Sequence, residues 1–114
     1  IERRLKEEMN LPVMHDDQHG TAIISAAALI NACEIQKKKI KDIKIVVNGA
    51  GAAAISCTRL YVALGAQKEN IVMLDRTGVI RADRPDLDGT KAEFATKRDI
   101  FTLTDAVKNA DVFI

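Results

Sequence analysis

The sequence predicts an α/β protein with a Rossmann-like, doubly wound parallel sheet. β-Branched runs of strand length alternate with alanine-rich runs of helical length, which is typical of parallel sheets covered by helices on both faces. A glycine turn at residues 49–51 follows one of these strands and opens a helix, the order found in dinucleotide-binding βαβ units. The last residues, 110–114, resemble a strand with no turn after it. We therefore expect a sheet truncated at the C-terminal end, and a segment of a longer protein.

The expected elements begin with a charged helix over residues 2–9, where Leu5 and Met9 stand at i, i+4 spacing and Pro12 prevents continuation. A short buried strand or extended segment is expected over 12–15. A long apolar helix over 21–36 carries few charges, which predicts burial on most sides. The remaining expected strands are 43–47, 70–74 and 111–114, and the remaining expected helices are 52–64, 91–97 and 103–109. A polar loop is expected over 76–90. Thr102 or Thr104 is expected to cap the helix over 103–109.

The composition of the chain argues against nucleic acid and membranes as partners. The formal net charge is +1 and 47% of the residues are hydrophobic, which is ordinary for a globular domain and gives no reason to expect nucleic acid as a partner. No run approaches the ~20 apolar residues that span a bilayer, so no membrane partner is expected. Cys33 and Cys57 lie in apolar helical segments, which favours reduced, buried thiols and a cytoplasmic protein.

The glycine turn predicts a cofactor site made mainly of backbone. Gly49 permits the tight turn, Gly51 lets the chain approach a pyrophosphate, and the small Ala54 lets helix and strand pack closely. The free N–H groups of the helix that begins near Ala52 are expected to face the phosphates. A turn that only connects a strand to a helix, in a domain that binds nothing, is the alternative.

Asp75 follows the next strand, where an acidic residue commonly accepts hydrogen bonds from ribose hydroxyl groups. An aspartate alone favours NAD, whereas the adjacent Arg76 suits the 2′-phosphate of NADP, so this pair leaves both cofactors open. The candidate cofactor-binding residues are Gly49, Ala50, Gly51, Ala52, Ala53, Asp75 and Arg76.

A second candidate site is the acidic turn before the long helix, where Asp16 and Asp17 are adjacent. One carboxylate is expected to bind a hard divalent cation, Mg²⁺ or Mn²⁺, and the other to cap the helix or orient a neighbour. The i, i+4 spacing of His15 and His19 is compatible with a zinc site, but no cysteine or third histidine is near, which disfavours zinc. A capped turn without a metal is the remaining alternative.

Taken together, these motifs resemble malic enzymes of the bacterial type. The resemblance lies in His15–Ala22, in Ile45–Ala53, in Leu74–Ile80 and in Ala110–Ile114, and it covers essentially the whole chain. It implies oxidative decarboxylation of L-malate to pyruvate and CO₂ with NAD or NADP and Mg²⁺ or Mn²⁺. Closeness to bacterial forms with an extra acetyltransferase-like domain favours NADP slightly.

The resemblance also implies residue roles. Asp17 would be a metal ligand and Asp16 its supporting neighbour, Gly49–Ala53 would hold the cofactor phosphates, and Asp75 would lie near the adenosine ribose. Residues 1–20 would end the substrate and metal region, and residues 21–114 would form part of the NAD(P)-binding domain.

The family's catalytic tyrosine and lysine and its other metal ligands match nothing in this chain, so we expect the segment alone to be inactive. Tyr61, the one tyrosine, is more plausibly a core or surface residue. The intact enzyme is expected to be a homo-oligomer. The alternatives are a metal-independent Rossmann dehydrogenase, such as an amino-acid dehydrogenase, and a non-catalytic nucleotide-binding or oligomerisation module.

Overall fold

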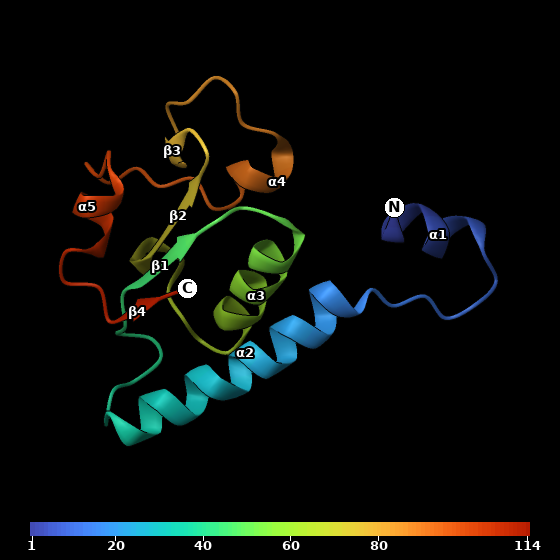
Figure 1. Ribbon diagram of the computed structural model, residues 1–114, viewed down its shortest axis with the longest axis horizontal. Coiled ribbons are helices and arrows are strands. Elements are labelled where there is room, and N and C mark those ends of the chain that lie inside the picture. Colours follow the sequence, from blue (N-terminus) through green and yellow to red (C-terminus); the bar gives the residue numbers. More distant parts are fainter.

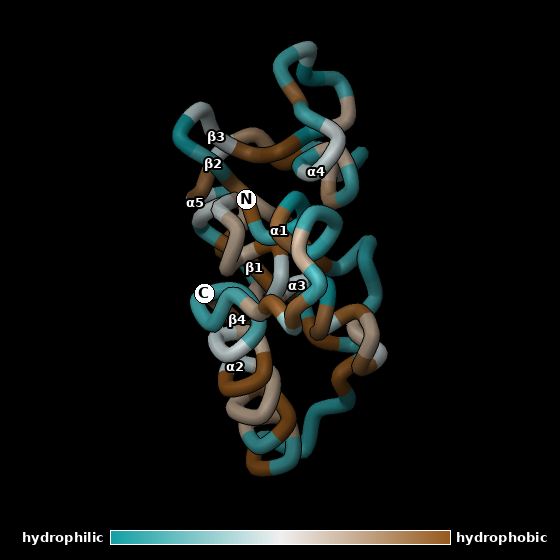
Figure 2. Tube along the Cα trace, turned by 90° about the vertical axis from the view of Figure 1, so that its right-hand side faces the viewer, coloured by the Kyte–Doolittle hydropathy of each residue, from teal (hydrophilic) through white to brown (hydrophobic).

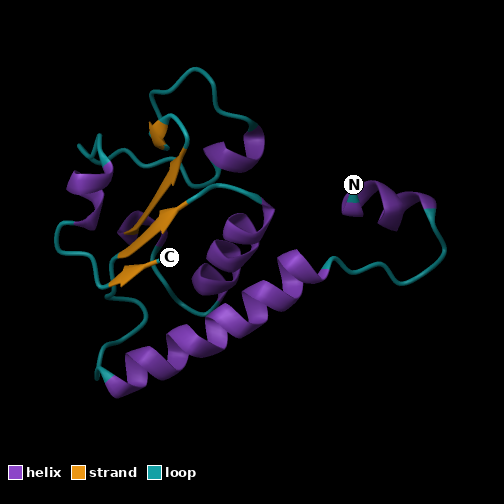
Figure 3. Ribbon diagram, viewed as in Figure 1, coloured by secondary structure: helices purple, strands orange, loops and turns teal.

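A computed structural model describes residues 1–114 and contains one four-stranded sheet in the order β3-β2-β1-β4 (Figures 1 and 3). The strands β1 (Ile45–Asn48), β2 (Ile71–Asp75) and β4 (Val112–Phe113) are parallel. The predicted α/β fold is therefore confirmed. The short β3 (Gly78–Val79), which the sequence analysis missed, pairs antiparallel with β2 and makes the sheet mixed.

Helices cover both faces of the sheet because side chains alternate along each strand. Ile45 and Val47 of β1 point into a larger core beneath α3 (Ala52–Ala63) and α2 (Asp16–Ile35), and α3 lies between the sheet and α2 (Figure 1). Val46 points to the opposite face, where a smaller core is closed by α5 (Leu103–Val107). This arrangement confirms the doubly wound architecture.

The N-terminal region differs from its prediction. The helix α1 (Glu2–Glu8) forms as expected, but residues 12–15 form no strand and are mostly exposed. The long helix starts at Asp16 rather than Thr21, with His15 as its N-cap residue. Two adjacent carboxylates stabilise a helix N-terminus, which explains why the helix extends back through them despite Gly20.

The expectation that this long helix is buried on most sides is wrong for this chain. Only one face of α2 is buried, through Ala22, Ala26, Leu29 and Cys33, at the spacing of a single helical stripe. The opposite face exposes isoleucines, and Ile24 and Ile35 are 72% and 76% exposed. Figure 2 shows that hydrophobic residues recur along the whole length of α2.

The segment after β2 is more structured than the predicted polar loop. It forms the β2–β3 hairpin, then returns through α4 (Gly89–Ala92), whose start is capped by the side chain of Asp88. The helix predicted over 91–97 is earlier and shorter than expected, since α4 ends at Ala92 and Thr96 forms a parallel bridge with Arg81 beside the sheet. The short 3₁₀ helix η1 (Lys68–Asn70) leads into β2.

Other local predictions are confirmed. Thr102 caps α5 in a capping box with Asp105, the first of the two proposed caps. Cys33 and Cys57 are buried free thiols. Tyr61 is fully buried in the core, where its hydroxyl group pairs with that of Ser25 on α2, and burial raises the pKa of the phenol. No helix combines the length and the apolar character needed to cross a lipid bilayer.

Candidate functional site

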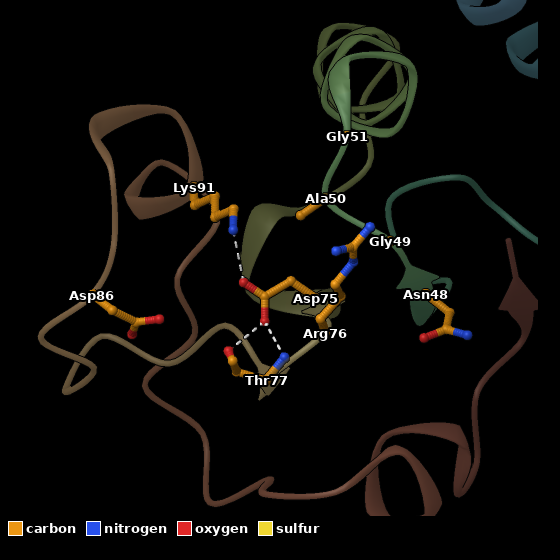
Figure 4. Close-up of a pocket in the computed structure, with 9 residues that line it drawn as sticks. All are labelled: Asn48, Gly49, Ala50, Gly51, Asp75, Arg76, Thr77, Asp86 and Lys91. Atoms are coloured by element: carbon orange, nitrogen blue, oxygen red, sulfur yellow. Dashed lines mark hydrogen bonds and ion pairs between the residues drawn. The ribbon is translucent and has the colours of Figure 1, made fainter.

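A pocket of about 670 Å³ opens at the carboxyl ends of β1 and β2. Strands β2 and β4 lie on opposite sides of β1, so the chain changes direction across the sheet at this point. Such a switch point is where open α/β sheets bind ligands. The pocket is lined by Asn48, Gly49, Ala50, Gly51, Asp75, Arg76, Thr77, Asp86 and Lys91 (Figure 4).

The glycine turn forms one wall of this pocket. Gly49 has φ +153°, which side-chain-bearing residues rarely adopt, and nothing lies within 4 Å of the place where a Cβ atom would be at Gly49 or Gly51. No side chain caps α3, and the first of its amides to donate within the helix is that of Ile55, to the carbonyl of Gly51. The amides before it are open to an anion in the pocket.

The carboxylate of Asp75 lies at the centre of a dense set of protein donors. Nη1 and Nη2 of Arg84 donate to its two oxygens at 2.9 and 3.2 Å, and Nζ of Lys91 donates to Oδ2 at 2.9 Å. The amide and hydroxyl groups of Thr77 donate to Oδ1 at 3.0 and 2.8 Å. A carboxylate offers about four lone-pair positions, so these five donors use its whole accepting capacity.

These contacts fix the charge state of the pocket. The Arg84 guanidinium holds the pKa of Asp75 well below its usual range, and Lys91 and Thr77 act in the same direction. Arg84 also pairs with Asp86, at 2.6 Å from Nη2 to Oδ2. The exposed Arg76 has no such partner, and its side chain extends from the end of β2 toward the glycine turn (Figure 4). The pocket lining thus holds two cations, Arg76 and Lys91, and two carboxylates, Asp75 and Asp86, and Arg76 is the cation without an ion-pair partner.

The acidic turn does not line this pocket. Asp16 and Asp17 occupy the first turn of α2, where both are exposed, and neither forms an ion pair. Gln18, the next residue, lines a smaller cavity of about 270 Å³ together with Ala50, Gly51 and Lys91. The residue that follows the acidic pair therefore lies at the glycine turn, whereas the two aspartates line neither of these cavities.

The donor set at the acidic turn suits a hard cation but is incomplete within this chain. Carboxylate oxygens are the ligands that Mg²⁺ and Mn²⁺ prefer. No group of three potential ligands gathers anywhere in the structure. Nε2 of His19 lies 2.8 Å from Oε1 of Glu2, so this histidine is engaged by α1 rather than paired with His15. Glu2 itself has its pKa lowered to about 2, mainly by Lys6.

Most of the predicted cofactor residues meet in one place. Gly49, Ala50, Gly51, Asp75 and Arg76 line the larger pocket, and Ala52 lines the smaller one, whereas Ala53 lines neither. The sequence analysis missed Asn48, Thr77, Arg84, Asp86 and Lys91. The Gly78 turn signal could have revealed the hairpin that positions Thr77, but no local pattern marks Arg84 or Lys91, which reach Asp75 across a long excursion.

Comparison with known proteins identifies the family. The family described as "Malic enzyme, NAD binding domain" matches residues 18–113. The chain is 56% identical to an NADP-dependent malic enzyme of Halomonas elongata, over all of this chain and 27% of the relative, and 50% identical to an NAD-dependent malic enzyme of Rhizobium meliloti, over all of this chain and 15% of the relative. The crystal structure of Entamoeba histolytica malic enzyme superposes with a TM-score of 0.90 at 35% identity, over 99% of this chain and 25% of that protein.

Proposed function

The chain belongs to the malic enzyme family, as a segment of its NAD-binding domain, and from this we propose that it holds the cofactor of an enzyme that converts L-malate to pyruvate and CO₂. The observation that supports this most is the open glycine turn at the switch point of the sheet, with Gln18 of the His15–Ala22 segment lining the cavity next to it. The chain spans about a quarter or less of the length of the curated relatives compared above, so the proposed activity belongs to a longer protein.

In this proposal the glycine turn and the start of α3 hold the pyrophosphate of the cofactor. The amides from Ala50 to Ala54 make no helical bond and carry the positive end of the α3 dipole. Gly51 lets the backbone approach the phosphates because no side chain covers it. The nicotinamide would then extend toward the acidic turn, on the side where Gln18 meets Gly51.

Asp17 would be the ligand that this chain contributes to a divalent metal, Mg²⁺ or Mn²⁺, with Asp16 supporting it. When bound, the metal polarises the oxygen at C2 of the substrate and stabilises the charge left as CO₂ departs. The exposure of both carboxylates and their lack of ion pairs leave their oxygens available. We further propose that residues 1–20 end the substrate and metal region and that residues 21–114 form the cofactor-binding region.

The charges around Asp75 favour NADP over NAD in this proposal. A ribose hydroxyl group can donate to Asp75 only by displacing Thr77, Arg84 or Lys91, because all its accepting positions are used. A 2′-phosphate can instead pair with the guanidinium group of Arg76, which has no ion-pair partner in the protein. The similar relatives include both NADP-dependent and NAD-dependent enzymes, so membership of the family does not decide the cofactor. The proposed preference for NADP follows from the residues around Asp75 alone.

Arg76→Ala is expected to raise the Kd for NADP about 10- to 100-fold, the loss of one charge-assisted phosphate contact of about 1.5–3 kcal/mol. The Kd for NAD is expected to stay within about 2-fold, because the two cofactors differ only in the 2′-phosphate. Fluorescence titration with NADPH and NADH checks both values. Lys39→Ala removes an exposed lysine at the opposite end of the sheet and serves as the control. Equal losses for both cofactors would contradict the assignment of Arg76.

The two glycines of the turn are expected to respond differently to alanine. Gly49→Ala forces a side chain into φ +153° and is expected to destabilise the protein by about 1–3 kcal/mol. Gly51 has φ −79° and ψ 178°, which any residue adopts, so Gly51→Ala should keep its stability but weaken NADPH binding at least about 10-fold. Urea denaturation and NADPH fluorescence measure the two effects. Undiminished NADPH binding by Gly51→Ala would mean that the phosphates lie elsewhere.

The proposed function is tested by assaying the full-length protein for L-malate-dependent reduction of NADP and NAD, with Mn²⁺ and with EDTA. We expect reduction with Mn²⁺, little with EDTA, and a higher kcat/KM for NADP. Reduction that is insensitive to EDTA would favour a metal-independent dehydrogenase. Cofactor binding without any turnover would favour a non-catalytic nucleotide-binding module. We also propose a cytoplasmic homo-oligomer, which size-exclusion chromatography with light scattering and cell fractionation would test.

A further inference from the structure

Gly20 is an unexplained glycine. It lies in the second turn of α2, a 20-residue helix, and it is not among the glycines with positive φ. Glycine destabilises a helix interior relative to alanine, because it loses more backbone freedom on folding. Neither a turn nor an unusual backbone conformation therefore accounts for glycine at this position.

The space that a side chain would take at Gly20 is filled by Asp16. A Cβ atom built on Gly20 would lie 2.0 Å from Oδ1 of Asp16, 2.8 Å from its Cγ and 3.3 Å from its Oδ2, and these are the three nearest atoms. Gly49, Gly51 and Gly89 have nothing within 4 Å of the corresponding point. Gly20 is thus the one glycine at which a carboxylate fills the space of the missing side chain. This carboxylate belongs to Asp16, four residues earlier on the same helix face.

No interaction with the rest of the fold stabilises this position of the Asp16 carboxylate. It accepts no hydrogen bond from the protein and forms no ion pair, and Asp16 is exposed. The carboxylate instead borders an open groove along α2, together with Thr21 and Ser25, whereas Asp17 does not line that groove. The two adjacent aspartates are therefore directed differently, and the absence of a side chain at residue 20 allows the conformation of the first.

We infer that Gly20 is a positioning residue, which lets the Asp16 carboxylate lie against the second turn of α2 and so sets the geometry of the acidic turn. An alanine at this position would push the carboxylate into another rotamer. The consequence for catalysis rests on the proposed function, in which Asp16 supports the metal ligand Asp17. The consequence for the helix rests only on the contact between Asp16 and Gly20.

A double-mutant cycle in the full-length protein tests this inference, with Gly20→Ala, Asp16→Ala and the combined variant. Three quantities are measured: the unfolding midpoint in urea, the Kd for Mn²⁺ by electron paramagnetic resonance, and kcat with L-malate. Gly20→Ala is expected to weaken Mn²⁺ binding and lower kcat about 10- to 100-fold, the usual effect of disturbing a group that supports a metal ligand. In the Asp16→Ala background the same substitution is expected to change both values by less than about 2-fold.

The stability part of the cycle separates this inference from the proposed function. Gly20→Ala is expected to raise the unfolding midpoint more in the Asp16→Ala background than in the wild type, because the clash is then absent. An equal shift in both backgrounds would overturn the inference, whether or not the protein oxidises malate. Equal functional losses in both backgrounds, or wild-type Mn²⁺ affinity and kcat in Gly20→Ala, would also overturn it. A wild-type protein that binds no Mn²⁺ and does not oxidise malate would overturn the proposed function, and with it the catalytic half of the inference.

Discussion

Asp17→Ala is expected to lower kcat for L-malate oxidation in the full-length protein about 10³-fold, since metal polarisation of the substrate is worth several kcal/mol and each 1.36 kcal/mol is a factor of ten. Asp17 is exposed and makes no ion pair, and the next residue, Gln18, lines a cavity together with Gly51 of the glycine turn. Loss of this carboxylate removes the proposed oxygen ligand without exposing any buried surface. Steady-state kinetics over a range of Mn²⁺ concentrations measures the loss.

The fold should survive this substitution. Asp17 is one of two acidic residues in the first turn of α2, and Asp16 remains to interact with the helix dipole. NADPH binding is therefore expected to be retained. Asp42→Ala, which removes another exposed carboxylate at the opposite end of the sheet, is the control and should keep full activity. Malate oxidation by Asp17→Ala at a rate close to that of the wild type would exclude Asp17 as a metal ligand.

Asp75→Asn is expected to destabilise the protein by about 2–3 kcal/mol, because it breaks a nearly buried ion pair, leaves Lys91 without a carboxylate partner and leaves Arg84 with Asp86 alone. The side chains of Asp75 and Arg84 are only 9% and 15% exposed. Both Arg84 and Lys91 lie in the segment that returns from β2 to the sheet edge, so this segment should lose order first. Urea denaturation measures the stability, and hydrogen exchange of residues 77–96 measures the order.

The matched control for Asp75 is Asp86, which pairs with the same arginine but whose side chain is 53% exposed. Asp86→Asn is expected to destabilise the protein much less, because exposed ion pairs are screened by solvent.

The stabilisation that Asp75 contributes also depends on pH, with a definite sign. Its pKa is lowered in the folded state, so its stabilisation is complete above the unfolded value of ~3.9 and is lost as the pH falls below it.

The difference in stability between the wild type and Asp75→Asn should accordingly stay constant from about pH 8 to pH 5 and shrink below about pH 4. A difference that instead grew as the pH fell would mean that the carboxylate is not held in its charged form by Arg84 and Lys91.

The glycine turn was predictable from sequence because its information is local. A strand, two glycines and a helix are contiguous, and Gly49 has the unusual φ that the turn requires. The environment of Asp75 was not predictable in the same way. Its partners Arg84 and Lys91 lie 9 and 16 residues further on, within a segment whose path depends on the β2–β3 hairpin and on the bridge from Arg81 to Thr96.

The acidic turn shows a different limit of sequence analysis. The residues were identified, but the helix was expected to begin at Thr21, after them, whereas it begins at Asp16. Glycine inside a helix is unfavourable, so helix propensity alone does not predict a helix that passes through Gly20. The Asp16 carboxylate fills the space that a side chain at Gly20 would take, and no sequence pattern predicts this contact between a side chain and the backbone.

The most direct test of the proposed reaction is the stoichiometry of CO₂ release by the full-length protein with Mn²⁺, NADP and L-malate labelled with ¹³C at C4. Oxidative decarboxylation predicts one labelled CO₂ and one pyruvate for each NADPH formed, with all three abolished by EDTA. NADPH formed without labelled CO₂, with oxaloacetate as the product, would show a simple dehydrogenase and contradict the account.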